Sequence, residues 1–174
     1  IFALARSGGT DVFNAAGGTG ITALLDTWIH ICLAVDRSHE ANLYINGSTS
    51  TYGFADLDIS GESSTNLNNT GDLLLGQRNS SSYYNGKMTE IAIWQNTYLS
   101  APMVTEIYNS GKPFDLRFNR GNYARAENLV GYWRTNDGRG AVVEDQSGAG
   151  IQTGTLNGAG AYGDGVWNSD TPDD

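Results

Sequence analysis

The sequence predicts an all-β sandwich built as one domain, and three observations point to it. Only 17% of the 174 residues are charged, while 23 are Gly and 3 are Pro. Short apolar runs recur between clusters of Gly, Asn, Ser and Thr. Residues 28–35 alternate with a period of two, which places successive side chains on opposite faces of a strand. This length suits a single well-packed domain.

The first half of the chain is expected to consist of strands around that central stretch. After residues 28–35 comes a polar turn, then a strand at Leu43–Ile45. Asn46 and Gly47 can supply the positive φ angles of a tight hairpin turn, and a third strand should begin near Thr49. Three short strands are expected before the hairpin, at 1–4, 11–15 and 20–25. Ile1 lies within a strand already under way, so we expect earlier strands of the module to be missing.

The second half combines further strands with one helix. Residues 50–71 are polar and predict a long surface connection with one edge strand in it. Ser100 as N-cap, Pro102 in the first turn, then Gly111 and Pro113 delimit a helix. Strands are expected at 72–76, 88–94, 129–133 and 141–144, with a polar loop at 77–82 and a loose acidic tail at 158–174.

Charge and cysteine content exclude several classes of function. The net charge of −9 argues against a nucleic-acid partner, because such proteins carry basic patches. No apolar run reaches the 18 residues that indicate a membrane span, so membrane insertion is not expected. Cys32 is the single cysteine, which rules out an internal disulfide and predicts a small buried hydrophobe.

An ordered series of short motifs resembles the laminin G-like and pentraxin-like superfamily over roughly residues 1–115. The resemblance implies a concanavalin A-like jelly roll with two curved sheets. Residues 129–158 are similar to the opening of such a module, so 116–174 are expected to fold back and complete the same sandwich. The motifs are Trp28-Ile29-His30, Leu43-Tyr44-Ile45-Asn46-Gly47, Leu75-Gly76, Tyr84-Asn85-Gly86-Lys87-Met88-Thr89-Glu90-Ile91-Ala92-Ile93-Trp94, Leu99-Ser100 and Ile107-Tyr108.

Calcium is what the pentraxin side of the resemblance implies for the loop that follows Gly76. Gln77 and Asn79 are the weak calcium candidates there. Arg78 stands between them and no carboxylate follows before Glu90, whereas calcium takes six or more oxygens with several carboxylates among them. The prediction is therefore no cofactor, with calcium as the alternative.

Catalysis is not expected. Glycosidases that share this sandwich place a Glu-x-Asp-x-x-Glu pattern on one strand, and here Ala92 takes the middle acidic position after Glu90. His30 and His39 stand beside no nucleophile signature and form no His-Glu-x-x-His pattern, so His30 is expected to be a satisfied strand residue.

The expected function is recognition of glycans or protein partners at a cell or virion surface. Aromatic faces and amide groups hold sugars, and the chain has 9 Tyr and 4 Trp, of which Trp94 and Trp133 are expected to pack internally. Two alternatives stay open. One is a structural virion decoration or fibre domain, whose 112–125 segment and extended tail would dock other capsid subunits, and the other, more distant, is a glycosidase. The predicted binding residues are Gln77, Asn79, Tyr83, Tyr84 and Tyr52.

Overall fold

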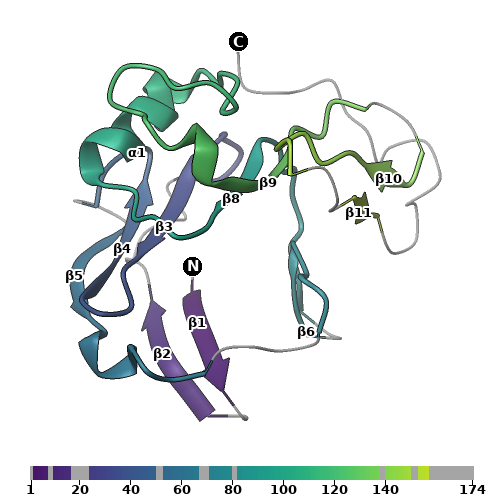
Figure 1. Cartoon of the computed structure of the whole chain (residues 1–174). Helices are drawn as coiled ribbons and strands as arrows, with labels where there is room; N and C mark the ends of the chain where they lie inside the picture. The colour runs from purple at the N-terminus through teal and green to yellow at the C-terminus, as the bar shows by residue number, and fades with distance from the viewer. Residues whose placement is uncertain are drawn as a thin grey trace.

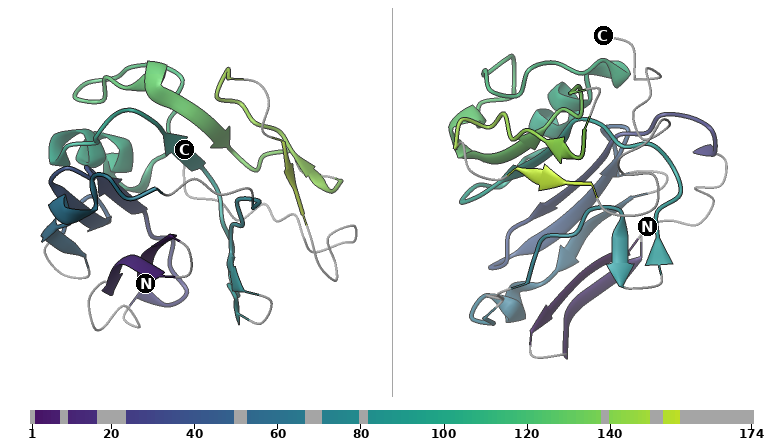
Figure 2. Two further views of the ribbon diagram at one scale, coloured as in Figure 1. Left: turned by 60° about the horizontal axis from the view of Figure 1, so that its bottom comes forward. Right: turned by 90° about the vertical axis from the view of Figure 1, so that its right-hand side faces the viewer.

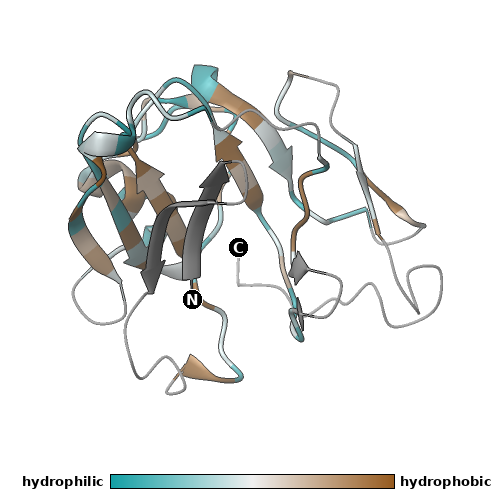
Figure 3. Cartoon of the chain, turned by 90° about the horizontal axis from the view of Figure 1, so that it is seen from below, coloured by the Kyte–Doolittle hydropathy of each residue, from teal (hydrophilic) through white to brown (hydrophobic). Residues whose placement is uncertain are grey.

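The computed structural model describes residues 2–7, 10–16, 24–49, 53–66, 71–79, 82–137, 140–149 and 153–156 (Figure 1). These residues are mostly strands and loops, and their single α-helix is α1, Ala101–Tyr108. Hydrophobic and hydrophilic residues lie in short bands along the ribbon (Figure 3). The expected all-β class with one short helix is therefore confirmed.

The central hairpin forms a three-stranded antiparallel sheet in the order β3-β4-β5. Its strands are β3 (Ile31–Val35), β4 (Glu40–Ile45) and β5 (Phe54–Asp58). Asn46 and Gly47 have φ angles of 50° and 76°, so the predicted turn is confirmed. The edge strand expected within 50–71 is β5.

Three predicted strand limits in this sheet were wrong. β3 begins at Ile31 because His30 and Asn46, at the open end of the β3–β4 hairpin, bond through the Asn46 side chain and backbone: His30 N donates to Asn46 Oδ1, and Asn46 N donates to the His30 carbonyl. β4 begins at Glu40 because Asp36 Oδ1 accepts from Ser38 N and keeps the preceding turn short. The third strand begins at Phe54, beyond the position expected near residue 49.

The N-terminal strands pair as a separate antiparallel hairpin. β1 (Phe2–Ser7) pairs with β2 (Thr10–Ala16), which confirms the first two expected strands and makes each of them longer. Residues 20–23 of the third expected strand lie outside the described residues. Its last residues were predicted wrongly: they form a helical turn, which Thr27 Oγ1 closes with a 2.7 Å bond to the Leu24 carbonyl.

The segment around Gly76 differs most from the prediction. The leucine run at 72–76 forms no strand, and the expected polar loop at 77–82 carries a short hairpin instead, β6 (Gln77–Asn79) with β7 (Ser82–Tyr83). Gly76 has a φ of 75°, a left-handed conformation that interrupts an extended backbone. Pairing therefore begins only after the glycine.

Two strands of the second half, those expected at 88–94 and 141–144, are shorter than expected. β8 spans Ile91–Trp94 instead of starting at Met88, because Glu90 has a φ of 51° and leaves the extended region. β9 (Leu129–Trp133) has the predicted limits and pairs antiparallel with β8. The remaining pair is β10 (Val142–Val143) with β11 (Gly154–Thr155).

The helix α1 is confirmed, with differences at both ends. Pro102 lies in its first turn, but the Ser100 side chain makes no capping bond. Asn109, in the left-handed conformation, ends the helix before Gly111, and a 3₁₀ turn, η3 (Asn109–Gly111), follows. Two further 3₁₀ turns are η2 (Ser60–Glu62) and η4 (Ala126–Asn128).

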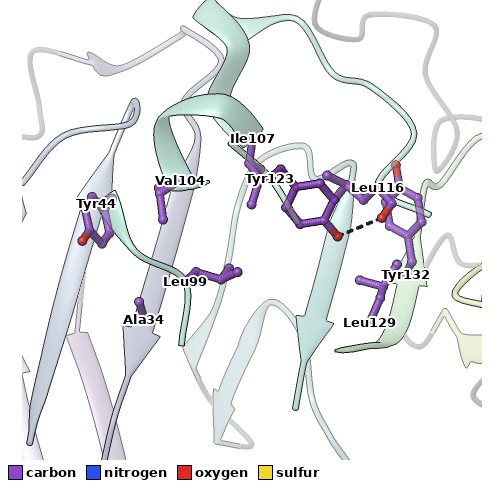
Figure 4. Packing of buried hydrophobic residues seen from close by; sticks show 9 residues of the cluster. All are labelled: Ala34, Tyr44, Leu99, Val104, Ile107, Leu116, Tyr123, Leu129 and Tyr132. Carbon is purple, nitrogen blue, oxygen red and sulfur yellow. Dashed lines mark hydrogen bonds between the residues drawn. The ribbon is translucent and has the colours of Figure 1, made fainter. Parts of the chain in front are cut away.

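One buried cluster joins the helix to the β3-β4-β5 sheet and to the β8–β9 pair. β8–β9 lies between the β3-β4-β5 sheet and the β6–β7 and β10–β11 hairpins (Figures 1 and 2). The helix and the segment that follows it cover the face to which β3, β4 and β9 contribute buried side chains (Figure 4). The cluster consists of Ala34, Tyr44, Leu99, Val104, Ile107, Leu116, Tyr123, Leu129 and Tyr132.

A polar network on β4 fixes the loop that leads into α1. Asn42 is only 4% exposed, and its Nδ2 donates to Tyr98 Oη at 2.6 Å and to Glu40 Oε1 at 3.0 Å. Tyr98 Oη in turn donates to Glu40 Oε1 at 3.0 Å. Asn42 Oδ1 accepts from Asp56 N at 2.8 Å. Such networks stabilise a fold only when all members have partners.

Replacing Tyr98 by phenylalanine should lower the free energy of unfolding by about 1–2 kcal/mol, because Asn42 and Glu40 each lose one partner. Urea unfolding followed by tryptophan fluorescence measures the change. The matched control is Tyr84→Phe, since the Tyr84 hydroxyl is exposed and makes only a 3.4 Å bond to the Lys87 carbonyl. Equal stability of the two variants would contradict the role of the network.

Candidate recognition surface

Three of the five predicted binding residues lie in the β6–β7 hairpin. Gln77 pairs with Tyr83 and Asn79 with Ser82, and the register shifts between the two pairs. Tyr84 follows directly, and its backbone N donates to the Gly76 carbonyl at 2.7 Å. The hairpin therefore brings the backbone of these residues together. Tyr52, the fifth predicted residue, lies outside the described residues.

Tyr84 presents its ring to solvent above the backbone of Gly86. Its side chain is 58% exposed. A Cβ added at Gly86 would lie 2.5 Å from Tyr84 Oη and 2.6 Å from Cζ, so the ring lies directly over the Gly86 backbone. Any larger residue at position 86 would displace it. A ring held this way keeps one apolar face available for a ligand.

Exposed apolar side chains stand on both sides of this tyrosine in the sequence, and the sequence did not predict them as part of the surface. Leu73, Leu74, Leu75 and Met88 are all exposed. A Cβ at Gly76 would lie 2.8 Å from Met88 Cε and 3.7 Å from Tyr84 Cβ, which places these two side chains against the same glycine. We call Leu73, Leu74, Leu75, Tyr84 and Met88 the apolar strip. The sequence signal that could have revealed it is Gly76, which ends the leucine run before a strand can pair.

No metal cluster occurs in the part of the chain that the structure describes. There, no three His, Cys, Asp or Glu side chains come together as a metal ion would require. Gln77 and Asn79 offer amide oxygens, whereas calcium sites combine amides with carboxylates. The two calcium candidates therefore share a strand without acidic support among the described residues.

Glu90, the residue nearest to a glycosidase pattern, has both carboxylate oxygens engaged. Arg134 Nε donates to Oε1 at 2.9 Å, and the Tyr132 hydroxyl donates to Oε2. The Arg134 guanidinium also stands 6.0 Å from the centre of the Tyr132 ring. Burial, and then the bond to Glu90, raise the pKa of Tyr132. This geometry ties β8 to β9 through a carboxylate that already accepts two bonds.

His30 was expected to lie in a strand with its hydrogen-bonding groups paired, and that prediction was wrong. It precedes β3, and its ring centre lies 5.8 Å from that of Tyr108 at the end of α1. Its Nδ1 atom is buried without a hydrogen-bond partner. Burial lowers the pKa of His30 to about 4. The imidazole is therefore neutral at neutral pH.

Three other side chains behave largely as the sequence predicted. Trp133 is buried, and Trp94 packs against the buried cluster. Cys32 also packs against it, and burial raises the pKa of its thiol to about 12, so the thiol stays protonated.

Within the described residues no helix is both long and apolar enough to cross a bilayer.

Comparison with known proteins gives one match. Residues 1–105 match the family model Laminin_G_3, described as the concanavalin A-like lectin/glucanases superfamily. The match covers more than half of the 174 residues and ends within α1. No curated protein and no solved structure matches the chain.

Proposed function

Because the chain belongs to the Laminin_G_3 family of the concanavalin A-like lectin/glucanases superfamily, we propose that it is a non-catalytic recognition module acting at a cell surface or outside the cell. The laminin G-like part of the resemblance is thereby confirmed. Within the proposal the strands form a jelly-roll sandwich. The pairing of β8 with β9 supports the inclusion of the C-terminal segment in that sandwich, since β9 lies beyond the matched range.

The exposed Tyr84 ring is the observation that carries the proposal. Tyr84 directly follows the β6–β7 hairpin, whose first strand contains Gln77 and Asn79, and it is an exposed member of the apolar strip. An aromatic face with amides nearby is the combination that binds the apolar face and the hydroxyl groups of a sugar ring. A glycan is therefore the ligand that this surface supports best.

The engaged carboxylate of Glu90 supports the non-catalytic part of the proposal. A glycosidase needs one carboxyl group as acid and another as base or nucleophile at the scissile bond. Glu90 instead accepts bonds from Tyr132 and Arg134, which occupy both of its carboxylate oxygens and hold them between two strands. Its role in the proposal is to join β8 to β9.

Replacing Tyr84 by alanine should weaken glycan binding about tenfold, since burying such a ring contributes roughly 1.5–3 kcal/mol. The measurement is binding of the whole chain to a broad glycan array, followed by titration of the best ligand in calcium and in EDTA. We expect the same affinity in both solutions, because the hairpin lacks calcium's usual carboxylates.

The matched control is Phe118→Ala, which removes another exposed aromatic ring far from the hairpin in sequence. It should leave glycan binding unchanged. An array without any bound glycan, or equal losses in the two variants, would refute the proposal. Loss of binding in EDTA would show that binding needs a divalent cation, for which Gln77 and Asn79 are the candidate ligands.

A further inference from the structure

The segment Lys112–Arg125, which we call the basic loop, has a charge opposite to that of the chain. It contains four basic residues against the single acid Asp115, while the whole chain has a net charge of −9. At its centre Phe118 is 66% exposed. The loop begins beyond residue 105, where the family match ends. We infer that the basic loop docks a short acidic segment of a partner protein, with Phe118 as the apolar anchor.

The backbone on both sides of Phe118 is held in place. Tyr123, which is fully buried, donates its hydroxyl to the Leu116 carbonyl at 2.8 Å. Arg120 and Tyr123 exchange two backbone bonds of 2.9 and 2.8 Å, and Asn119 Oδ1 accepts from Ala126 N. Phe118 thus protrudes from a preorganised loop, which reduces the entropy lost on binding.

Two arginines beside the exposed ring are also preorganised. Arg117 forms a two-pronged pair with Asp115 and stands 5.9 Å from the centre of the Phe118 ring. Arg120 lies 4.8 Å from the centre of the Phe114 ring and 3.5 Å from Glu106 Oε1. Both side chains remain nearly half exposed. Aromatic rings and arginines are the residues that dominate protein–protein hot spots.

The charge of the remaining chain determines the size and kind of partner. Outside the basic loop, 18 acidic residues face 6 basic ones, since the chain contains 19 and 10 in total. A long polyanion, such as a nucleic acid, would meet repulsion beyond the loop. A short acidic segment can stay on the basic loop, where Asp115 and Glu106 are already paired with Arg117 and Arg120, and an apolar residue within it can cover Phe118.

Selection of random 12-residue peptides displayed on phage against the whole chain provides the test. We expect enriched peptides that combine Asp or Glu with an aliphatic or aromatic residue. Binding of the selected peptides, measured by fluorescence anisotropy, should weaken about tenfold in Phe118→Ala and also in Arg117→Gln. Raising the salt from 50 to 300 mM should weaken it as well, because exposed charges are screened.

Tyr84→Ala is the matched control and should leave peptide binding unchanged, which separates this inference from the proposed glycan site. Because Phe118 is exposed, its replacement should not impair folding, and a thermal melt confirms that. The inference is wrong if no peptide is enriched, if the enriched peptides carry no excess of acids, or if Phe118→Ala binds them normally. The inference is also wrong if heparin displaces the peptides and binds the parent chain and Phe118→Ala with equal affinity, because that result would identify a general polyanion surface.

Discussion

Replacing Tyr123 by alanine is expected to lower the free energy of unfolding by about 4 kcal/mol, within the range for truncating a large buried aromatic residue. The side chain is 0% exposed and packs edge-on against Trp94 and Phe114, with ring centres 6.2 and 6.0 Å away. Its hydroxyl accepts from Trp94 Nε1 at 3.0 Å and donates to the Leu116 carbonyl. Truncation removes the packing and both bonds.

The variant Tyr123→Phe separates these contributions, because it keeps the ring and removes the hydroxyl. We expect it to cost about 1–2 kcal/mol, the effect of leaving Trp94 Nε1 and the Leu116 carbonyl without their partner. Urea unfolding monitored by tryptophan fluorescence measures both variants. Tyr84→Ala, on the surface, should stay within about 0.5 kcal/mol of the parent chain. A loss below 1 kcal/mol in Tyr123→Ala would mean that the basic loop is not part of the cooperative core.

The central hairpin was predictable because local rules and tertiary packing agree there. The alternation over 28–35 and the Asn46-Gly47 pair define a strand and a turn without help from the rest of the chain. The strand limits depend on bonds that a sequence does not display, such as the one from His30 N to Asn46 Oδ1. The start of β8 was equally unpredictable. Glu90 has a positive φ and so shortens the strand, and its carboxylate accepts bonds from Arg134 and Tyr132.

The leucine run at 72–76 shows why an apolar stretch alone does not establish a strand. Its composition suits a buried strand, but pairing starts only at Gln77, after Gly76 has turned the backbone. The sequence predicted a polar loop with binding residues Gln77, Asn79, Tyr83 and Tyr84, and the structure has the short β6–β7 hairpin there, so these residues are neighbours along the backbone because they are close in sequence. The apolar strip was missed because whether a leucine is buried depends on its neighbours in space.

The buried core at Tyr123 was missed for a related reason. Its ring partners Trp94 and Phe114 lie 29 and 9 residues away in the sequence, and neither spacing follows a helix or strand period. Tyr123 itself stands in a polar, arginine-rich loop, a composition that indicates a solvated surface. The composition correctly indicates that the arginines of this loop are solvated. The burial of Tyr123 instead follows from the contacts of its ring with residues distant in the sequence.

Lowering the pH from 7 to 4 should destabilise the fold by about 3 kcal/mol through His30 alone. Burial lowers the pKa of His30 to about 4 in the folded state, against 6.5 for an unperturbed histidine. The unfolded state therefore binds a proton first. The contribution to stability is complete above pH 6.5, is lost as the pH falls from 6.5 to 4, and changes little below 4.

Urea unfolding of the parent chain and of His30→Gln at several pH values between 7 and 4 measures this contribution. The difference in unfolding free energy between the two proteins should shrink by about 3 kcal/mol over that window, because glutamine does not titrate. Asp36 and Asp58 have pKa values lowered below 3.8, first through hydrogen bonds to Ser38 and Ser60, so their effect begins only below this window. His39→Gln is the matched control, since 76% of that side chain is exposed, and should reproduce the parent pH profile. A constant difference between the parent and His30→Gln would mean that water or a local rearrangement reaches the buried Nδ1 atom and stabilises the imidazolium at little cost.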